Sequence, residues 1–289
     1  MPGTDLTVIA LELIERRVPF CLATVVLCES TSGAETGQKL IARVGATSDT
    51  GGETIGAVGG LQLTTQIALL ALQQIAAGDI RLVRLTSSGE LLPDRRSRRG
   101  VAPAPDEVEV VLEPVLPPEQ LIIVGAGHIA VPLARLAAVV GFEVTVIDDR
   151  DRFANRERFP DAARIVVQPF EQAIVTQTIT AWTYLVLVTR GHEHDEATLR
   201  QVVGSPAPYI GMIGSRRRVL VVFERLRAMG VPEEFIRRIY APIGLDLGAR
   251  TAEEIALAIL AEIVTVKRRG RALPLRDLAP QPGGLNSRV

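Results

Sequence analysis

The sequence predicts an α/β protein, in which a C-terminal Rossmann-like parallel sheet with helices on both faces is preceded by a smaller α+β N-terminal module. Composition is the first reason: 47% of the 289 residues are hydrophobic but only 4% are aromatic, and such aliphatic cores suit buried parallel strands. The second is that, after residue 120, short apolar runs alternate with segments of helical periodicity. The third is a glycine-rich turn at residues 125–130, between a predicted strand and a predicted helix.

The N-terminal elements follow from hydrophobic spacing. Leu6, Ile9, Leu13 and Ile14 recur at helical intervals and predict an opening amphipathic helix. A second helix is expected at 61–77, closed by Gly78. Strands are expected at 21–27, 38–44, 53–58, 80–85 and 108–112, separated by loops rich in Ser, Thr and Gly.

A proline-rich stretch at 113–118 separates the two halves. It holds three prolines in five positions, which should join neither a helix nor a central strand. We therefore expect an N-terminal module at 1–113, a linker at 114–119, a Rossmann-like domain at 120–270 and a tail at 271–289. The prolines at 274, 280 and 282 indicate that the tail is loosely ordered.

The second half alternates strand and helix. Strands are expected at 121–124, 143–147, 165–167, 184–188 and 209–213, and helices at 129–140, 171–180, 195–203, 215–229 and 232–239. A last helix begins at Thr251, where Thr251 and Glu254 match a capping box, and ends at Gly270. This alternation implies a parallel sheet covered on both faces.

Charge and hydropathy exclude several partners. The formal net charge is −1, from 32 basic and 33 acidic residues, which gives no reason to expect nucleic acid. Four arginines at 95–99 form a local basic run, but no aromatic residues interleave with it, which favours a solvated loop. No apolar run approaches the roughly 18–20 residues of a membrane span, and the start does not resemble a signal peptide. We expect a cytoplasmic protein.

The two cysteines, Cys21 and Cys28, lie in or beside one apolar run. Along an extended strand they would be roughly 23 Å apart and on opposite faces, so they cannot bridge each other. They are interpreted as small buried hydrophobes.

The turn Gly125-Ala126-Gly127-His128-Ile129-Ala130 fits the pattern G-x-G-x-x-A. Its glycines allow a tight turn and close approach of a phosphate to a helix N-terminus. Asp148 ends the next predicted strand, 23 residues past Gly125, where an acid commonly binds a ribose hydroxyl. The pattern predicts binding of a nucleotide-like ligand, the alternative being a loop that serves another ligand or none.

All three histidines, His128, His192 and His194, fall in two loops at the carboxyl ends of predicted strands. One interpretation is contact with a ligand or proton transfer. A second is a metal site formed by His192 and His194 with Glu193 or Asp195. A third is simple helix capping.

The segment Gly214-Ser215-Arg216-Arg217-Arg218 places three arginines in the first turn of a predicted helix. Cations there cost roughly 0.3–1 kcal/mol each, and a bound anion would reverse that cost; the alternative is that the arginines are exposed and the helix tolerates the cost. The long loop 241–250 precedes the last helix, and its glycines and Asp246 indicate a shaped loop.

These segments together resemble the XdhC/CoxI family, the accessory factors of xanthine dehydrogenase and related molybdenum hydroxylases. The resemblance covers 124–136, 146–160, 188–195, 209–218 and 241–263. It implies a protein that binds molybdenum cofactor, supports its sulfuration with a sulfurtransferase and delivers it to an apo-hydroxylase. It also implies a homodimer. No metal ligands are assigned and no catalytic residue is identified. The predicted cofactor-binding residues are Gly125, Gly127, His128, Asp148, His192, His194, Gly214, Ser215, Arg216 and Arg217.

The first half resembles the family more weakly. There the family commonly shows Gly-Gly-Cys, whereas here Gly59-Gly60 is followed by Leu61. The preceding loop commonly carries a Pro-Arg pair, which residues 29–35 lack.

Two other functions fit part of the sequence. The glycine turn and Asp148 also favour an NAD-dependent oxidoreductase, although no second domain supplies an evident substrate pocket. A scaffold with a vestigial site is the third hypothesis.

Overall fold

A computed structural model describes residues 5–28, 31–45, 52–93 and 106–273 of the chain. The chain divides into two compact units, residues 1–117 and residues 118–289, each with its own sheet and hydrophobic core. In the described ranges, no helix has both the length and the apolar character needed to cross a membrane. The basic run at 95–99, the tail from 274 onward and part of the 29–35 loop lie outside these ranges.

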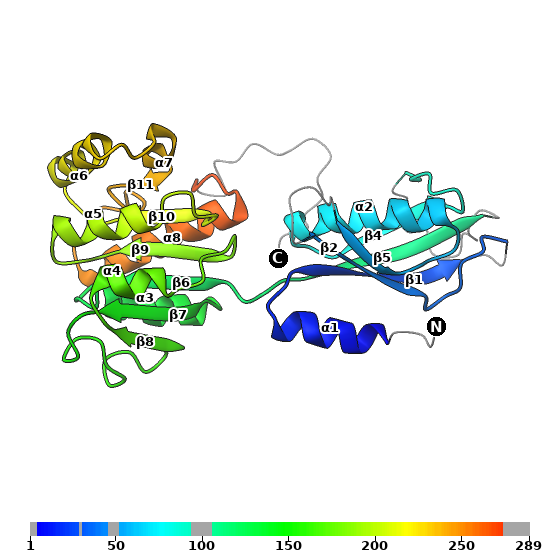
Figure 1. The fold of residues 1–289 in the computed structure, drawn as a ribbon, viewed down its shortest axis with the longest axis horizontal. Helices are drawn as coiled ribbons and strands as arrows, with labels where there is room; N and C mark the ends of the chain where they lie inside the picture. The colour runs from blue at the N-terminus through cyan, green and yellow to red at the C-terminus, as the bar shows by residue number, and fades with distance from the viewer. Residues whose placement is uncertain (1–4, 29–30, 46–51, 94–105, 274–289) are drawn as a thin grey trace. The chain divides into compact units, whose positions relative to one another are not determined.

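The first unit is a five-stranded antiparallel sheet in the order β3-β2-β1-β5-β4. Its elements are α1 (Leu6–Glu15), β1 (Phe20–Cys28), β2 (Lys39–Arg43), β3 (Glu53–Gly56), α2 (Leu61–Ala77), β4 (Arg81–Thr86) and β5 (Glu107–Val115). The long helix α2 covers one face of the sheet and α1 covers the other (Figure 1). The predicted α+β module is therefore present.

The prediction that the proline-rich stretch stays outside the sheet was wrong for its first residues. Strand β5 runs on to Val115, and Pro114 pairs with Cys21 of β1. The pairing of β4 with β5 ends at Leu112, so beyond that point β5 has one free edge. A proline in this position removes no ladder hydrogen bond to β4, which is why the strand tolerates it.

The cysteines do not lie on opposite faces, because a β-bulge shifts the register of β1 between Val25 and Leu27. The extra residue reverses the alternation, and Cys28 packs partly against the same core that buries Cys21. Both cysteines are free.

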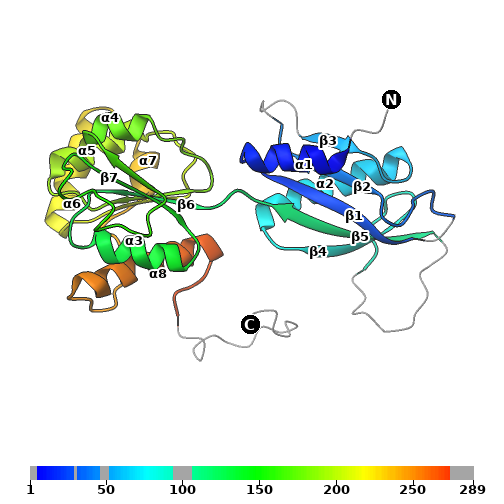
Figure 2. The ribbon, with the colours of Figure 1, turned by 90° about the horizontal axis from the view of Figure 1, so that it is seen from below.

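The second unit is a six-stranded parallel sheet in the order β11-β10-β9-β6-β7-β8. Its elements are β6 (Gln120–Val124), α3 (Ala130–Val139), β7 (Glu143–Asp148), β8 (Arg164–Val167), α4 (Phe170–Val175), β9 (Thr183–Leu187), α5 (His192–Gln201), β10 (Tyr209–Met212), α6 (Arg216–Ala228), α7 (Glu233–Arg237), β11 (Ile239–Tyr240) and α8 (Ala252–Arg268). Helices α3 and α8 lie along one face, and α4, α5 and α6 lie along the other (Figure 2). The predicted fold class is confirmed.

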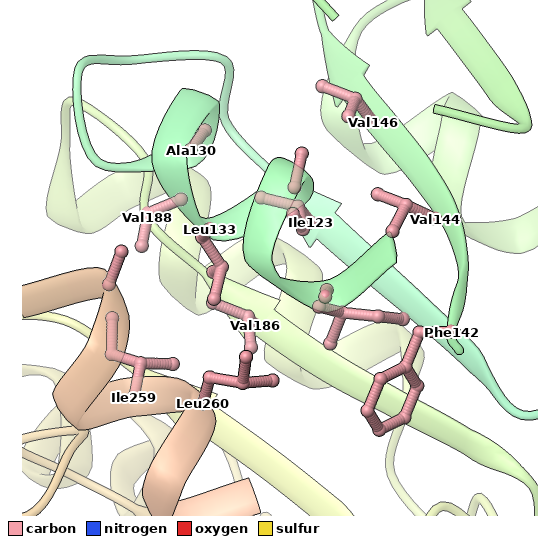
Figure 3. Packing of buried hydrophobic residues seen from close by; sticks show 14 of the residues in the cluster. Ile123, Ala130, Leu133, Phe142, Val144, Val146, Val186, Val188, Ile259 and Leu260 are labelled. Carbon is pink, nitrogen blue, oxygen red and sulfur yellow. The ribbon is translucent and has the colours of Figure 1, made fainter. Parts of the chain in front are cut away.

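The core under α3 and α8 consists mainly of aliphatic side chains. Figure 3 shows Leu133 of α3 and Ile259 of α8 directed toward Ile123 and Val186 on the central strands. The ring of Phe142 packs edge-on against Tyr184, with 5.3 Å between ring centroids. The branched aliphatic side chains fill the layer between the sheet and the helices, as parallel sheets require.

The larger differences from the predicted boundaries in the second unit concern three elements. Helix α4 ends at Val175 because the side chains of Thr176 and Gln177 donate to the Ala173 carbonyl and close its last turn. Helix α5 begins at His192, not at Asp195. Strand β11 was missed: Ile239 pairs with Ile210, so sheet pairing ends the predicted 232–239 helix early. The capping box at Thr251 is confirmed.

Candidate cofactor-binding site

The predicted site residues follow strand ends at one edge of the parallel sheet. Gly125 follows β6, Asp148 ends β7, and the segments at 188–195 and 213–218 follow β9 and β10. From β6 the chain builds β7 and β8 on one side, then returns to place β9 on the other side of β6. The carboxyl ends of β6 and β9 are therefore a topological switch point, the usual ligand position in such sheets.

Gly125 is required by its surroundings. Its φ of +107° lies in the region that favours glycine, and an added Cβ would stand 2.6 Å from the Val188 carbonyl oxygen. The turn after β6 thus touches the chain leaving β9. Gly127 has nothing within 4 Å of an added Cβ, so the second glycine lies beside open space.

The start of α3 offers unbonded amides. The N–H groups of Gly127, His128 and Ile129 form no hydrogen bond with any residue that the structure describes, and Ile129 gives the helix no side-chain cap. The side chain of His128 is exposed. Consecutive free amides at a helix N-terminus form a favourable environment for a phosphate or other anion.

Asp148 is fully buried at the end of β7. Its Oδ2 accepts from the Ala126 amide at 2.8 Å and from Arg150 Nη2 at 2.9 Å. Its Oδ1 accepts from Arg150 Nε at 2.8 Å and from the Arg150 amide at 3.1 Å. The predicted ribose acid is therefore already paired with an arginine of its own loop.

A second ion pair lies beside the first. Arg190, which follows β9, donates to both carboxylate oxygens of Asp149 at 2.7 Å. The hydrogen bonds from Arg190 hold the pKa of Asp149 at about 2, below its usual value. On the other side of the glycine turn, Arg158 donates to the Ala126 carbonyl at 2.9 Å. Arginines thus fix the turn and the ends of β7 and β9.

Asp195 is buried in the first turn of α5 and joins three segments. Its Oδ1 accepts from the Thr189 hydroxyl at 2.6 Å, and its Oδ2 pairs with Arg218 of α6. Burial raises the pKa of Asp195, against the opposing effects of Thr189 and Arg218. Its carboxylate is committed to these partners, which removes it from the predicted metal-ligand set.

The histidines after β9 belong to α5 and not to a free loop. His194 is half-buried, with its ring centroid 4.8 Å from that of Phe170, and its carbonyl accepts from Thr198. The side chain of His192 lies outside what the structure describes. Among the described residues, no group of three or more His, Cys, Asp or Glu side chains could hold a metal ion.

The three arginines at the start of α6 differ in their contacts. Ser215 caps the helix by accepting from the Arg218 amide at 3.3 Å. Arg218 crosses Gly214, where an added Cβ would meet its Cδ at 3.2 Å, on its way to Asp195. Arg216 and Arg217 are exposed and form no ion pair with any described residue. Two of the three cations are thus free for a ligand.

The long loop before α8 is fixed by a carboxylate that the sequence did not point to. Glu262 of α8 accepts from the Tyr209 hydroxyl at 2.6 Å and from the Gly244 amide at 3.0 Å. Asp246, by contrast, is exposed.

Sequence reasoning also missed Arg150, Arg190 and Thr189 as partners of the predicted residues. Of these, only Arg150 left a visible signal, a basic residue two positions after the ribose acid.

The second unit is, by its sheet order and its glycine turn, a doubly wound domain of the Rossmann type. Residues 121–263 match the XdhC Rossmann domain, and this part of the chain belongs to that family. The resemblance recognised in the sequence is thereby confirmed.

Three curated relatives are similar to the chain. The uncharacterized protein YqeB of Escherichia coli K12 is 27% identical over 283 residues, which is 96% of this chain and 47% of YqeB. A probable xanthine dehydrogenase subunit of Bacillus subtilis 168 is 32% identical over 55% of this chain and 46% of its own length. The molybdenum cofactor insertion chaperone PaoD of E. coli K12 is 26% identical over 51% and 40%. The chain thus spans about half the length of the curated relatives it matches, or less.

Proposed function

We propose that this protein is an accessory factor of a xanthine dehydrogenase-type molybdenum hydroxylase. In this role it binds molybdenum cofactor at the carboxyl edge of the second unit and supports its sulfuration and insertion. The observation that carries the proposal is the set of donors at this edge. The amides from Gly127 to Ile129, after β6, are bonded by no described residue, and Arg216 and Arg217 are exposed after β10, which is separated from β6 by β9. The names of two relatives, a xanthine dehydrogenase subunit and a cofactor insertion chaperone, support the same role.

The donor set fits the phosphate of the cofactor. Backbone amides at a helix start bind phosphate without a counter-charge, and guanidinium groups form charge-assisted hydrogen bonds to its oxygens. Arg216 and Arg217 oppose the dipole of α6 when nothing is bound, and an anion would remove that cost. When bound, the cofactor supplies the molybdenum chemistry, and the side chains of this chain hold and orient it. We propose that His128 and His194 line the approach, with the Asp195–Arg218 pair positioning α5 against α6.

The partners follow from the same proposal. They are an apo-hydroxylase and a sulfurtransferase, and the chain acts as a homodimer in the cytoplasm, where its two free thiols stay reduced. Leu61 begins α2 and is 82% exposed. It stands where the family commonly has a cysteine, so we propose that sulfur comes from the partner enzyme.

Native mass spectrometry under anaerobic conditions tests the proposal. The protein is mixed with molybdenum cofactor or with NAD, and a complex with the cofactor is expected. The double variant Arg216→Glu, Arg217→Glu should reduce cofactor binding at least tenfold, because each substitution replaces a cation by an anion.

The control is Arg16→Glu with Arg81→Glu, which makes the same charge change at exposed positions of the first unit. Equal loss of cofactor binding in both double variants would show that the effect comes from net charge alone. No complex with the cofactor, together with a complex with NAD, would replace the proposal by an oxidoreductase.

A further inference from the structure

We propose that Arg150 is a specificity-determining residue that closes the ribose position of this Rossmann site, so that the site takes its ligand through phosphate and rejects NAD-type dinucleotides. The inference rests on the proposed function and concerns the ligand class of that site. Its evidence is the environment of one buried carboxylate at the end of β7.

All acceptor positions of Asp148 are filled. An ionised carboxylate offers about four lone-pair positions, and this one receives four donors at 2.8–3.1 Å, three of them from Arg150 and one from Ala126. The side chain is 0% exposed. In a dinucleotide-binding domain the acid at this position accepts from the ribose hydroxyls. Here the ribose diol would first have to displace the Arg150 guanidinium from Asp148.

Arg150 is held against such displacement. Its guanidinium lies 3.8 Å from the centroid of the Phe153 ring, and its Nε is 3.7 Å from Asp149. Moving it outward would leave the buried Asp148 with Arg190 Nη1, at 3.9 Å, as its remaining counter-charge and without three of its four hydrogen bonds, which is unfavourable. Swinging the arginine aside is thus far costlier than rotating an exposed side chain.

The neighbouring carboxylate, Asp149, is also paired with an arginine. Asp149 is occupied by both terminal nitrogens of Arg190. Two acids and two arginines therefore neutralise each other across the ends of β7 and β9. The amides at 127–129, which no described residue bonds, favour an anion over a sugar hydroxyl.

Calorimetric titration with NAD tests the inference on the full chain. The unmodified protein should show no binding at millimolar NAD. Arg150→Met removes the guanidinium but keeps an unbranched stem over Phe153, and it should raise the affinity for NAD at least tenfold. Phe153→Ala, which removes the ring under Arg150, should give a smaller gain. The control is Arg152→Ala, because Arg152 lies over the same ring at 5.2 Å but does not contact Asp148; no change is expected.

The outcomes are distinct. Micromolar binding of NAD by the unmodified protein would overturn the inference, as would a folded Arg150→Met variant with no gain. If that variant fails to fold, the Phe153→Ala titration decides, and the unmodified protein remains a test by itself. Failure of the protein to bind molybdenum cofactor would overturn the proposed function while leaving the NAD result intact.

Discussion

The two units use the same layering but different strand directions. Each has one sheet with helices on both faces. In the antiparallel first unit, successive strands end at opposite edges, so the loops are shared between the two ends. In the parallel second unit, every strand ends at one edge, which brings Gly125, Asp148, Thr189 and Ser215 to the same side. Strand direction alone therefore decides which unit can assemble a site from distant segments.

The buried ion pairs of the two units make this contrast specific. In the first unit, Arg84 of β4 pairs with Glu107 of β5, and both side chains are largely buried. In the second unit, Asp195 of α5 pairs with Arg218 of α6. The first pair joins adjacent strands within a sheet, whereas the second joins two helix starts at the candidate site. Breaking the Arg84–Glu107 pair should affect stability alone, whereas breaking the Asp195–Arg218 pair should affect both stability and ligand binding.

The largest expected effect comes from breaking these pairs. Asp195→Ala should lower the free energy of unfolding by about 3–5 kcal/mol, because it removes the carboxylate that pairs with the partly buried Arg218. Glu107→Ala should lower it by less, because Arg84 keeps Glu109 at 3.5 Å. Only Asp195→Ala should also weaken binding of pyrophosphate, used here as a probe of the proposed phosphate site, by roughly tenfold. Urea unfolding followed by fluorescence of the single tryptophan, Trp182, reports on the second unit; circular dichroism reports on both. Weaker pyrophosphate binding by Glu107→Ala would contradict this contrast between the ion pairs of the two units.

A smaller effect is expected at the glycine turn. Gly125→Ala should destabilise the second unit by about 2–4 kcal/mol, because it combines a positive φ with a collision against the Val188 backbone. Gly127→Ala is the matched control, with free space for a methyl group, and its stability should change by less than about 1 kcal/mol. Thermal unfolding of both variants measures the difference. Equal melting temperatures would show that the turn is not held against β9.

An acid-range effect is expected from the Arg190–Asp149 pair. Folding lowers the pKa of Asp149 from 3.8 to about 2, so its contribution is present above pH 4 and is lost as the pH falls toward 2. The contribution should be under about 1 kcal/mol, since both side chains are partly exposed. Between pH 5 and pH 3, Asp149→Asn should lose less stability than the unmodified protein. Asp161→Asn, a change at an exposed acid, should behave like the unmodified protein.

The smallest effect involves no change in stability. Both cysteines lie in the first unit, so thiol chemistry reports on that unit alone. Burial raises the pKa of Cys21 to about 12, and a disulfide reagent at pH 8 should leave it unmodified. Cys28 is half-buried and should react. One thiol should titrate in the native protein and two in urea, and Cys28→Ser should abolish the native reaction. Two native thiols would contradict the burial of Cys21.

The fold was predicted well where periodicity is long or capped. The limits of α2 were predicted to the residue, and the α8 start was found from Thr251 and Glu254, because these signals are local. Two of the errors arose from tertiary pairing. Strand β11 exists because Ile239 meets β10, and Pro114 lies in a strand because β4 ends before it. Neither neighbour is visible in a local window.

The candidate site was predicted in position but not in its internal bonding. Strand ends placed Gly125, Asp148 and Ser215 at one edge, since parallel topology alone requires it. No local pattern indicates that Thr189 and Arg218 share Asp195, because those residues lie in separate segments and meet only after folding. That Arg150 occupies Asp148 depends on a side-chain conformation, which spacing does not determine.

The late position of β5 has a consequence for synthesis of the chain. This strand is central, between β1 and β4, yet it is the last element of the first unit to leave the ribosome. Until it emerges, β1 and β4 each lack a neighbour, and the α2 core lacks Val108, Val110 and Leu112. Such long-range pairing slows folding, and a fragment ending before Glu107 would expose two unpaired strand edges. The first unit therefore closes only as translation of the second begins.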